Sequence, residues 1–189
     1  YLTTVLDNQG NQTATLVASG SNRKYVTIDE IPINLQHAFV AIEDERFYDH
    51  NGIDLQGILR AGLKGVASGF HFSEGASTIT QQLLKNTVFT QWTSEQSMAD
   101  KFERKFQEQY LALQLEKVVD KDWILENYLN AINLGQNTLG VGVASERYFG
   151  KDVSELTLSE CAVLAAITQS PSYYNPITHP DHNKERRQK

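Results

Sequence analysis

The chain has few residues of several kinds, and each shortage excludes a class of protein. Cys161 is the only cysteine among the 189 residues, so the chain cannot form an intramolecular disulfide. Apolar residues never run for about 18 positions or more, so no segment is predicted to span a membrane. Lys and Arg number 17 against 23 Asp and Glu, and a net charge of −6 gives no overall basic surface. Nucleic acid is therefore not expected as a partner.

What the chain does contain is typical of a single globular domain. Hydrophobic residues make up 40% and charged residues 21%, unlike a disordered chain, and 189 residues can bury a sizeable core. The basic residues are unevenly distributed, because Lys101, Arg104 and Lys105 lie close together in mid-chain. Such a cluster can form a local anion-binding site in an acidic protein.

Residues 1–30 have the composition of β-strands and turns. Residues 4–6 and 13–17 are apolar or β-branched and flank the turn residues 7–10, a pattern that predicts a hairpin. A second turn is expected at 20–22, followed by a short strand at 25–28. We interpret this part as a peripheral lead-in to the domain.

From Pro32 onward the apolar residues recur with a helical period. Leu35, Phe39 and Ile42 follow Pro32 at helical spacings and stand directly before Glu43. Capping boxes predict the starts of two later helices. Helices are predicted from 32 to about 43, 55 to 66, 93 to 118, 120 to 130, 142 to 149 and 157 to 168, with loops at 67–75 and 133–142. The prolines at 171, 176 and 180 are expected to end regular structure, so the fold class is mainly α with a short β-type lead-in.

The first motif that suggests chemistry is the acidic segment 43–52. Glu43, Asp44 and Glu45 adjoin at the end of the apolar stripe, and consecutive carboxylates on a helix point in different directions. One or two of them can therefore share a site, and a partly buried carboxylate there suits a general base. An ordinary charged helix end is the alternative. Metal binding by His50 with Asp49 and Asp54 is a weaker alternative, because the spacing lacks the glycine of a calcium loop.

The second acidic motif, 104–108, lies in the long predicted helix. Four apolar residues share one arc of this helix: Phe102, Phe106, Tyr110 and Leu113. The charged residues occupy the opposite side, which becomes apolar just past Glu108 and so favours a carboxylate at the mouth of a cleft. A routine ion pair between Arg104 and Glu108 is the alternative. Two acids around one site can serve chemistry at a sugar carbon, where one activates the attacking oxygen and the other handles the leaving group.

The third motif, 75–86, combines a glycine, two hydroxyl residues and the start of a helix. Free N–H groups at such a helix start can bind phosphate, and Gln81, Gln82 and Lys85 add donors in the first turns. The segment is not a Walker sequence, because no Gly-Lys-Thr follows at the required distance. A plain Ser/Thr N-cap is the alternative.

Two further segments carry polar residues at helical spacing. Glu126 and Asn130 share a face of the helix at 120–130 and can brace a site or cap a neighbouring helix. Lys151 follows an expected helix end at Gly150, where it is predicted to be exposed.

Taken in order, these motifs resemble the peptidoglycan glycosyltransferase domain of class A penicillin-binding proteins and monofunctional transglycosylases, glycosyltransferase family 51. Five motifs carry the resemblance, which covers roughly residues 30–187: Glu-Asp-x-x-Phe-x-x-His-x-Gly at 43–52, Gly-x-Ser-Thr-Ile-Thr-Gln-Gln at 75–82, Arg-Lys-x-x-Glu at 104–108, Lys-x-x-Ile-Leu-Glu-x-Tyr-Leu-Asn at 121–130 and Tyr-Phe-Gly-Lys at 148–151. The chain departs conservatively at Ala144-Ser145, where the family often has two alanines.

The resemblance implies a lysozyme-like, two-lobed helical domain that joins sugars. By analogy, Glu43 takes the proton from the 4-hydroxyl of an acceptor N-acetylglucosamine. That oxygen attacks the anomeric carbon of the N-acetylmuramic acid that ends the growing chain, and undecaprenyl pyrophosphate leaves with inversion. Glu108 assists near the leaving group or orients the basic residues, and Glu126 is a structural brace. The remaining matched residues are implied to bind the donor and acceptor: Asp44, Phe47, His50, Gly75, Ser77, Thr78, Gln81, Gln82, Lys85, Asn86, Arg104, Lys105 and Lys151.

The same resemblance implies where the protein acts. Residues 1–30 are expected to follow a membrane anchor, and 31–189 to form the glycosyltransferase domain, in which 55–74 is a mobile, membrane-facing region. The implied location is the extracytoplasmic face of the cell membrane. The implied partners are lipid II, the growing glycan strand, the membrane surface and a C-terminal transpeptidase domain.

The motifs require no cofactor, although a divalent cation (Mg²⁺ or Mn²⁺) at the pyrophosphate is compatible with them. Two other functions stay open: a lysozyme-like glycan hydrolase and a non-catalytic glycan-binding module. A hydrolase has less use for cations at a pyrophosphate, so Lys85 and Arg104 favour the hexosyltransferase.

Overall fold

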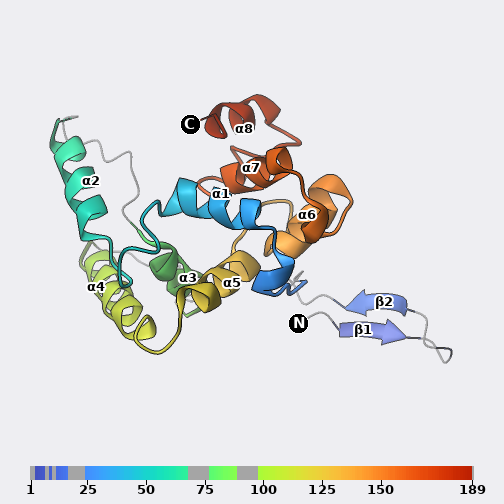
Figure 1. Cartoon of the computed structure of the whole chain (residues 1–189), viewed down its shortest axis with the longest axis horizontal. Coiled ribbons are helices and arrows are strands. Elements are labelled where there is room, and N and C mark those ends of the chain that lie inside the picture. Colours follow the sequence, from blue (N-terminus) through green and yellow to red (C-terminus); the bar gives the residue numbers. More distant parts are fainter. Residues whose placement is uncertain are drawn as a thin grey trace. The chain divides into compact units, whose positions relative to one another are not determined.

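The protein is mainly α-helical, as the sequence predicts (Figure 1). The computed structural model describes residues 3–6, 9, 12–16, 24–67, 77–88 and 98–188. These residues form the following elements: β1 (Thr3–Leu6), β2 (Gln12–Leu16), η1 (Ile28–Glu30), α1 (Ile33–Glu43), α2 (Leu55–Ala67), α3 (Ile79–Thr87), α4 (Met98–Leu115), α5 (Lys121–Ala131), α6 (Val141–Phe149), η3 (Val153–Glu155), α7 (Leu158–Ile167) and α8 (Pro180–Arg186). No helix in the described part of the chain is long and apolar enough to cross a membrane.

The chain divides into two compact units. One contains residues 1–38 and 129–189, and the other contains residues 39–128. Each unit has its own buried residues, among them Ile132 and Leu164 in the first and Phe47 and Ile124 in the second. Both acidic motifs of the sequence fall in the second unit, so that unit contains most of the candidate site.

The predicted N-terminal hairpin is confirmed, but the strand predicted at 25–28 is wrong. β1 and β2 pair antiparallel, with Thr3 opposite Leu16. The turns predicted at 7–10 and 20–22 fall largely or wholly outside the described residues. The 3₁₀ helix η1 begins at Ile28 because Thr27 and Glu30 form a capping box, in which the Thr27 N–H donates to a Glu30 carboxylate oxygen at 2.8 Å.

Asn130 of α5 binds the backbone of the segment that precedes η1. Its Oδ1 accepts from the Val26 N–H at 2.9 Å, and its Nδ2 donates to the Val26 carbonyl at 2.8 Å. Gly140, with φ of +87°, lies against the same residue, since a Cβ there would be 2.7 Å from the Asn130 carbonyl oxygen. Asn130 therefore braces the N-terminal segment, with both of its hydrogen-bonding groups used on one residue.

The helix ends of the first unit follow the sequence signals, with one exception. α6 ends at Gly150 in the left-handed conformation, and Thr157 and Glu160 form the predicted capping box of α7. The prediction that the last proline ends regular structure is wrong, because Pro180 begins α8. A proline ring fits the first helical turn, where no N–H is needed for an intrahelical bond.

In the second unit, the loop after α1 packs closely on α4. Gly52 has φ of +89°, and a Cβ at that position would be 2.6 Å from the carbonyl oxygen of Ala112. Only glycine allows this approach. The loop 44–52 is thereby fixed beside the helix that contains Glu108.

α4 turns its charged side inward and its aromatic side outward. Glu108 is 2% exposed, whereas Phe102 and Phe106 are 63% and 70% exposed. α2 presents a second exposed apolar row through Leu55 and Leu59. The loop predicted at 67–75 lies outside the described residues beyond Ala67, and the capping box predicted at 93–96 lies outside them entirely.

Candidate active site

Asp44 connects the loop after α1 to the first turn of α3. One of its oxygens accepts from the Ile79 N–H at 2.9 Å, and both lie 3.0 Å from His50 Nε2. The other ring nitrogen of His50 accepts from the Gly52 N–H at 3.2 Å, so the Nε2 proton must point at Asp44. The weak metal alternative around His50 is therefore not supported, because both ring nitrogens are already bound within the protein.

The N-terminus of α3 is closed by groups of the protein itself. Thr78 is the N-cap: its hydroxyl accepts from the Gln81 N–H at 3.2 Å and donates to the Gly52 carbonyl at 2.8 Å. Together with Asp44 on Ile79, two of the first three backbone donors are occupied. The plain N-cap alternative thus describes this helix start, and a substrate phosphate would meet side chains there. Gly75 lies outside the described residues.

Glu43 is the last residue of α1 and is partly exposed. Gln82, one turn into α3, donates from Nε2 to a Glu43 oxygen at 2.9 Å. The other end of the same amide, Oε1, accepts from the Tyr128 hydroxyl at 3.4 Å. Sequence reasoning placed Gln82 on the substrate and gave Tyr128 no role. The only signal for Tyr128 is its place in the motif at 121–130.

Glu108 lies deeper than the mouth of a cleft, because it is buried and bound by two cations. The Arg104 guanidinium bonds one carboxylate oxygen, as the i, i+4 alternative predicted, and Lys105 Nζ lies 3.2 Å from the other. Lys105 also donates to the Ser77 hydroxyl at 2.8 Å and to Gln81 Oε1 at 3.2 Å. With two positive charges and one negative, this cluster has a net charge of +1 and suits an anion.

Gln81 leaves one buried donor without an acceptor. Its Nε2 is buried and has no hydrogen-bond partner among the described residues. Turning the amide around would set its NH₂ against the Lys105 ammonium, so the orientation is fixed. A buried donor left unsatisfied costs about 1–3 kcal/mol, and a substrate oxygen or a water molecule would remove that cost.

Phe47 is fully buried and so packs in the core of the unit. Lys121 Nζ lies 4.4 Å from the centre of its ring and 2.6 Å from Glu116, which in turn accepts from the Thr80 hydroxyl at 2.5 Å. These contacts join the loop 44–52 to α3, to the chain after α4 and to α5. Phe47 therefore contacts protein side chains rather than an open surface. Sequence reasoning gave Thr80, Glu116 and Lys121 no role.

The remaining predicted residues have different surroundings. Lys85 is exposed and makes no hydrogen bond or ion pair with any described residue, and Asn86 is half-buried. Glu126 is half-buried on α5, and its role as a brace stays a prediction. Lys151 belongs to the first unit, where its Nζ lies 2.9 Å from the Glu160 carboxylate. Its role toward the donor phosphates also stays a prediction.

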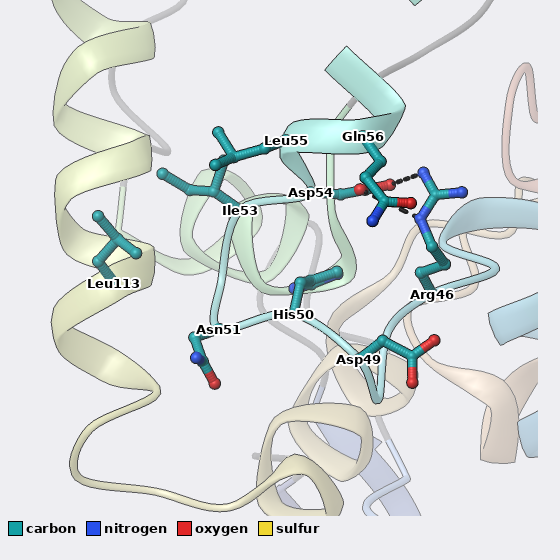
Figure 2. A pocket seen from close by; sticks show the side chains of 9 residues that line it. All are labelled: Arg46, Asp49, His50, Asn51, Ile53, Asp54, Leu55, Gln56 and Leu113. Carbon is teal, nitrogen blue, oxygen red and sulfur yellow. Dashed lines mark hydrogen bonds and ion pairs between the residues drawn. The ribbon is translucent and has the colours of Figure 1, made fainter. Parts of the chain in front are cut away.

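A pocket of about 430 Å³ lies beside the loop 44–52 (Figure 2). The salt bridge between Arg46 and Asp54 lies at one side, and Leu55 and Leu113 line the other. His50 lines the pocket, but Glu43 and Glu108 do not. The pocket thus lies between the start of α2 and the outward face of α4.

The carboxylates of the candidate site have few oxygens available to bind a divalent cation. Within the described ranges, no three His, Cys, Asp or Glu side chains are grouped so that they could hold a metal ion. The oxygens of Glu108 accept from Arg104 and Lys105, and those of Asp44 face Ile79 and His50. A cation at this site would have to be bound mainly by the oxygens of the substrate.

Comparison with known proteins gives consistent matches. The family model described as Transglycosylase matches residues 9–189. The chain is 47% identical over 182 residues to "Penicillin-binding protein 1A" of Clostridium perfringens, covering 95% of this chain and 25% of that protein. It is 46% identical over 184 residues to "Penicillin-binding protein 1F" of Bacillus subtilis, covering 97% of this chain and 24% of that protein. The chain thus spans about a quarter of the length of these relatives.

Among solved structures, the crystal structure of penicillin-binding protein 1A from Haemophilus influenzae resembles this chain with a TM-score of 0.49. The two sequences are 22% identical, and the match covers 99% of this chain and 17% of that one.

Proposed function

Because this chain belongs to the transglycosylase family, we propose that it is a peptidoglycan glycosyltransferase that polymerises lipid II into glycan strands. The observation that carries the proposal is the contrast between two carboxylates of one unit. Glu43 is partly exposed and accepts from a neutral amide, whereas Glu108 is buried between Arg104 and Lys105. A base on the acceptor side and a cationic group on the leaving-group side are the two functions that this reaction needs.

In the proposed reaction, Glu43 takes the proton of the acceptor 4-hydroxyl. A new bond forms between that oxygen and the anomeric carbon of the donor sugar. The bond from this carbon to the pyrophosphate oxygen breaks on the opposite face, so the configuration inverts. The leaving pyrophosphate carries away the bonding electrons as negative charge. The proton on Glu43 is then lost to solvent.

The leaving charge is received by the groups around Glu108. Arg104 and Lys105 are already placed by their bonds to this carboxylate, so they need no reorganisation when the pyrophosphate departs. The Ser77 hydroxyl and Gln81 Nε2, which has no partner among the described residues, add neutral donors beside them. Glu108 is thus proposed to orient Arg104 and Lys105, and no step uses a divalent ion, because the described residues offer no clear set of ligands for one.

The same contacts favour a transferase over a lysozyme-like hydrolase. A hydrolase of that kind needs a protonated carboxyl group at the leaving oxygen. Both oxygens of Glu108 accept from cations and neither is placed to donate a proton. A module that only bound glycan would also have no use for two cations held on one carboxylate.

We further propose that the enzyme works at the extracytoplasmic face of the cell membrane. Lipid II carries an undecaprenyl chain that stays in the bilayer, so the site must lie close to lipid. The exposed apolar rows of α2 and α4 support this location, because exposed hydrophobic patches of this kind mark membrane or protein contacts. A preceding membrane anchor and a following transpeptidase domain remain part of the proposal.

The direct test is incubation of the purified protein with lipid II in detergent. Polymer formation with release of undecaprenyl pyrophosphate is expected, and Glu43→Gln should lower the rate about 10²- to 10⁴-fold, the usual contribution of a general base. Glu45→Gln is the matched control, because Glu45 is an exposed carboxylate that faces Arg60 at 3.5 Å. Shortening of preformed glycan would favour the hydrolase, and unchanged polymerisation by Glu43→Gln would remove Glu43 as the base.

A further inference from the structure

We propose that Tyr128 is a positioning residue that acts on the base Glu43 through the side chain of Gln82, an inference that rests on the proposed function. Gln82 bridges the two groups, since its Nε2 donates to Glu43 at 2.9 Å and its Oε1 lies 3.4 Å from the Tyr128 hydroxyl. The three residues come from α1, α3 and α5 and all belong to the second unit.

The two ends of the Gln82 amide are chemically different, and Tyr128 holds the carbonyl end in place. An ionised carboxylate can only accept hydrogen bonds, so the NH₂ end must face Glu43. The carbonyl end then needs a donor, which the Tyr128 hydroxyl supplies. Without that hydroxyl, the carbonyl end loses its donor, and the amide is free to move away from the position in which its NH₂ faces Glu43. That movement would weaken a hydrogen bond that orients the carboxylate.

The Tyr128 hydroxyl keeps its proton and its place. Burial, and then the negative charges of Glu43 and Asp44, raise the pKa of Tyr128 well above its usual value of 10.0. The group is therefore a donor at any working pH. The ring is fixed by an edge-to-face contact with Phe39, 6.2 Å between centroids, and Phe39 lies one helical turn before Glu43 on α1.

Tyr128 does not contact the substrate itself. Its side chain is fully buried, so it cannot touch an acceptor sugar or a lipid phosphate. Its influence must reach the reaction through the orientation of the base. We therefore expect the rate of the chemical step to depend on it and the binding of lipid II to be nearly independent of it.

Tyr128→Phe tests the proposal, because it removes only the hydroxyl. At 3.4 Å the hydrogen bond is long, so the expected loss in kcat is modest, about three- to tenfold, with KM for lipid II changed less than about twofold. Tyr148→Phe is the matched control. Its hydroxyl donates to the Leu134 carbonyl at 2.7 Å in the other unit, and we expect its kcat to equal that of the wild type.

A double-mutant cycle separates a relay through Gln82 from a general packing effect. In a Gln82→Leu background, Tyr128→Phe should lower kcat no further, because the bridge is already gone. An equal fold loss in both backgrounds, or an unchanged kcat in the single variant, would overturn the relay while leaving the proposed function intact. A wild-type protein that forms no polymer would overturn the proposed function and this inference with it.

Discussion

Glu43 and Glu108 lie in the same compact unit, yet the protein surrounds them in opposite ways. Glu43 ends a helix, is partly exposed and is bound by a neutral amide. Glu108 lies in the middle of a helix, is buried and accepts from two cations. A carboxylate that must take a proton from a substrate needs access, whereas one that orients cations needs burial and full pairing. The surroundings of each group therefore separate two roles that composition alone leaves interchangeable.

The largest expected effect on stability comes from Glu108→Gln. Removing this charge takes away the carboxylate that both Arg104 and Lys105 contact, so we expect lost stability as well as lost activity. We expect the free energy of unfolding to fall by about 2 kcal/mol, below the ~3–5 kcal/mol of a fully buried pair because both cations are partly solvated. Denaturant unfolding measures the change.

Two control variants make that result specific. Glu43→Gln should lose activity with little change in stability, since an amide can still meet Gln82. Glu103→Gln alters an exposed carboxylate of the same helix, which accepts from Gln107 at 3.2 Å, and should change neither property. Equal stability of the Glu43 and Glu108 variants would contradict the distinction between an accessible base and a buried anchor for cations.

A second prediction concerns the outward face of the helix that carries Glu108. Phe106 is 70% exposed in the protein, and its replacement by Ser should weaken binding to phospholipid vesicles about tenfold. An aromatic ring that becomes partly buried in the bilayer contributes roughly 1.4 kcal/mol to the binding free energy. Vesicle sedimentation measures the affinity. Leu158→Ser is the control, because Leu158 is an exposed apolar residue of α7 in the other unit. Equal losses in both variants would show that the outward face of α4 has no special role.

The smallest expected effect concerns a third carboxylate, Glu160, which pairs with Lys151 at the surface. Lys151 lowers the pKa of Glu160 to about 2 from its usual 4.5, and bonds from Thr157 add to this. The pKa of Glu160 is lower in the folded protein than in the unfolded chain. The ionised carboxylate therefore stabilises the fold above pH 4.5, and this stabilisation disappears as the pH falls toward 2. In Lys151→Met the pKa of Glu160 should rise toward 4.5, as measured by carbon NMR. An unchanged pKa would show that Lys151 is not paired there.

Much of the helical structure could be predicted from periodicity and capping residues. α1 ends at Glu43 directly after its apolar stripe, α6 ends at Gly150, and α7 starts with its predicted capping box. Each of these signals lies within a few residues of the feature that it predicts. The two failures had other causes. Val26 pairs with Asn130, 104 residues away, instead of with a strand, and Pro180 begins a helix instead of ending one.

The sequence predicted which residues form the candidate site better than it predicted the contacts between them. Most matched residues do gather in one unit, but the sequence could not tell that Asp44 closes the start of α3 or that Gln82 faces Glu43. Those contacts join residues 35 and 39 positions apart, and no local spacing encodes them. α4 shows the same limit, because its pattern defines two faces without stating which one is buried.

The two hydrogen bonds between Asn130 and Val26 have a practical consequence for exchanging domains between proteins. A fragment that starts at the first helix would lose the two hydrogen bonds between the Asn130 side chain and Val26, and it would also lose the Lys24 and Val26 atoms that lie against Gly142. A fragment that starts at Lys24 keeps both bonds, and it also keeps the contacts of Lys24 with Glu146 and Asp152. In a chimera with one of the longer relatives, the junction therefore belongs before Lys24.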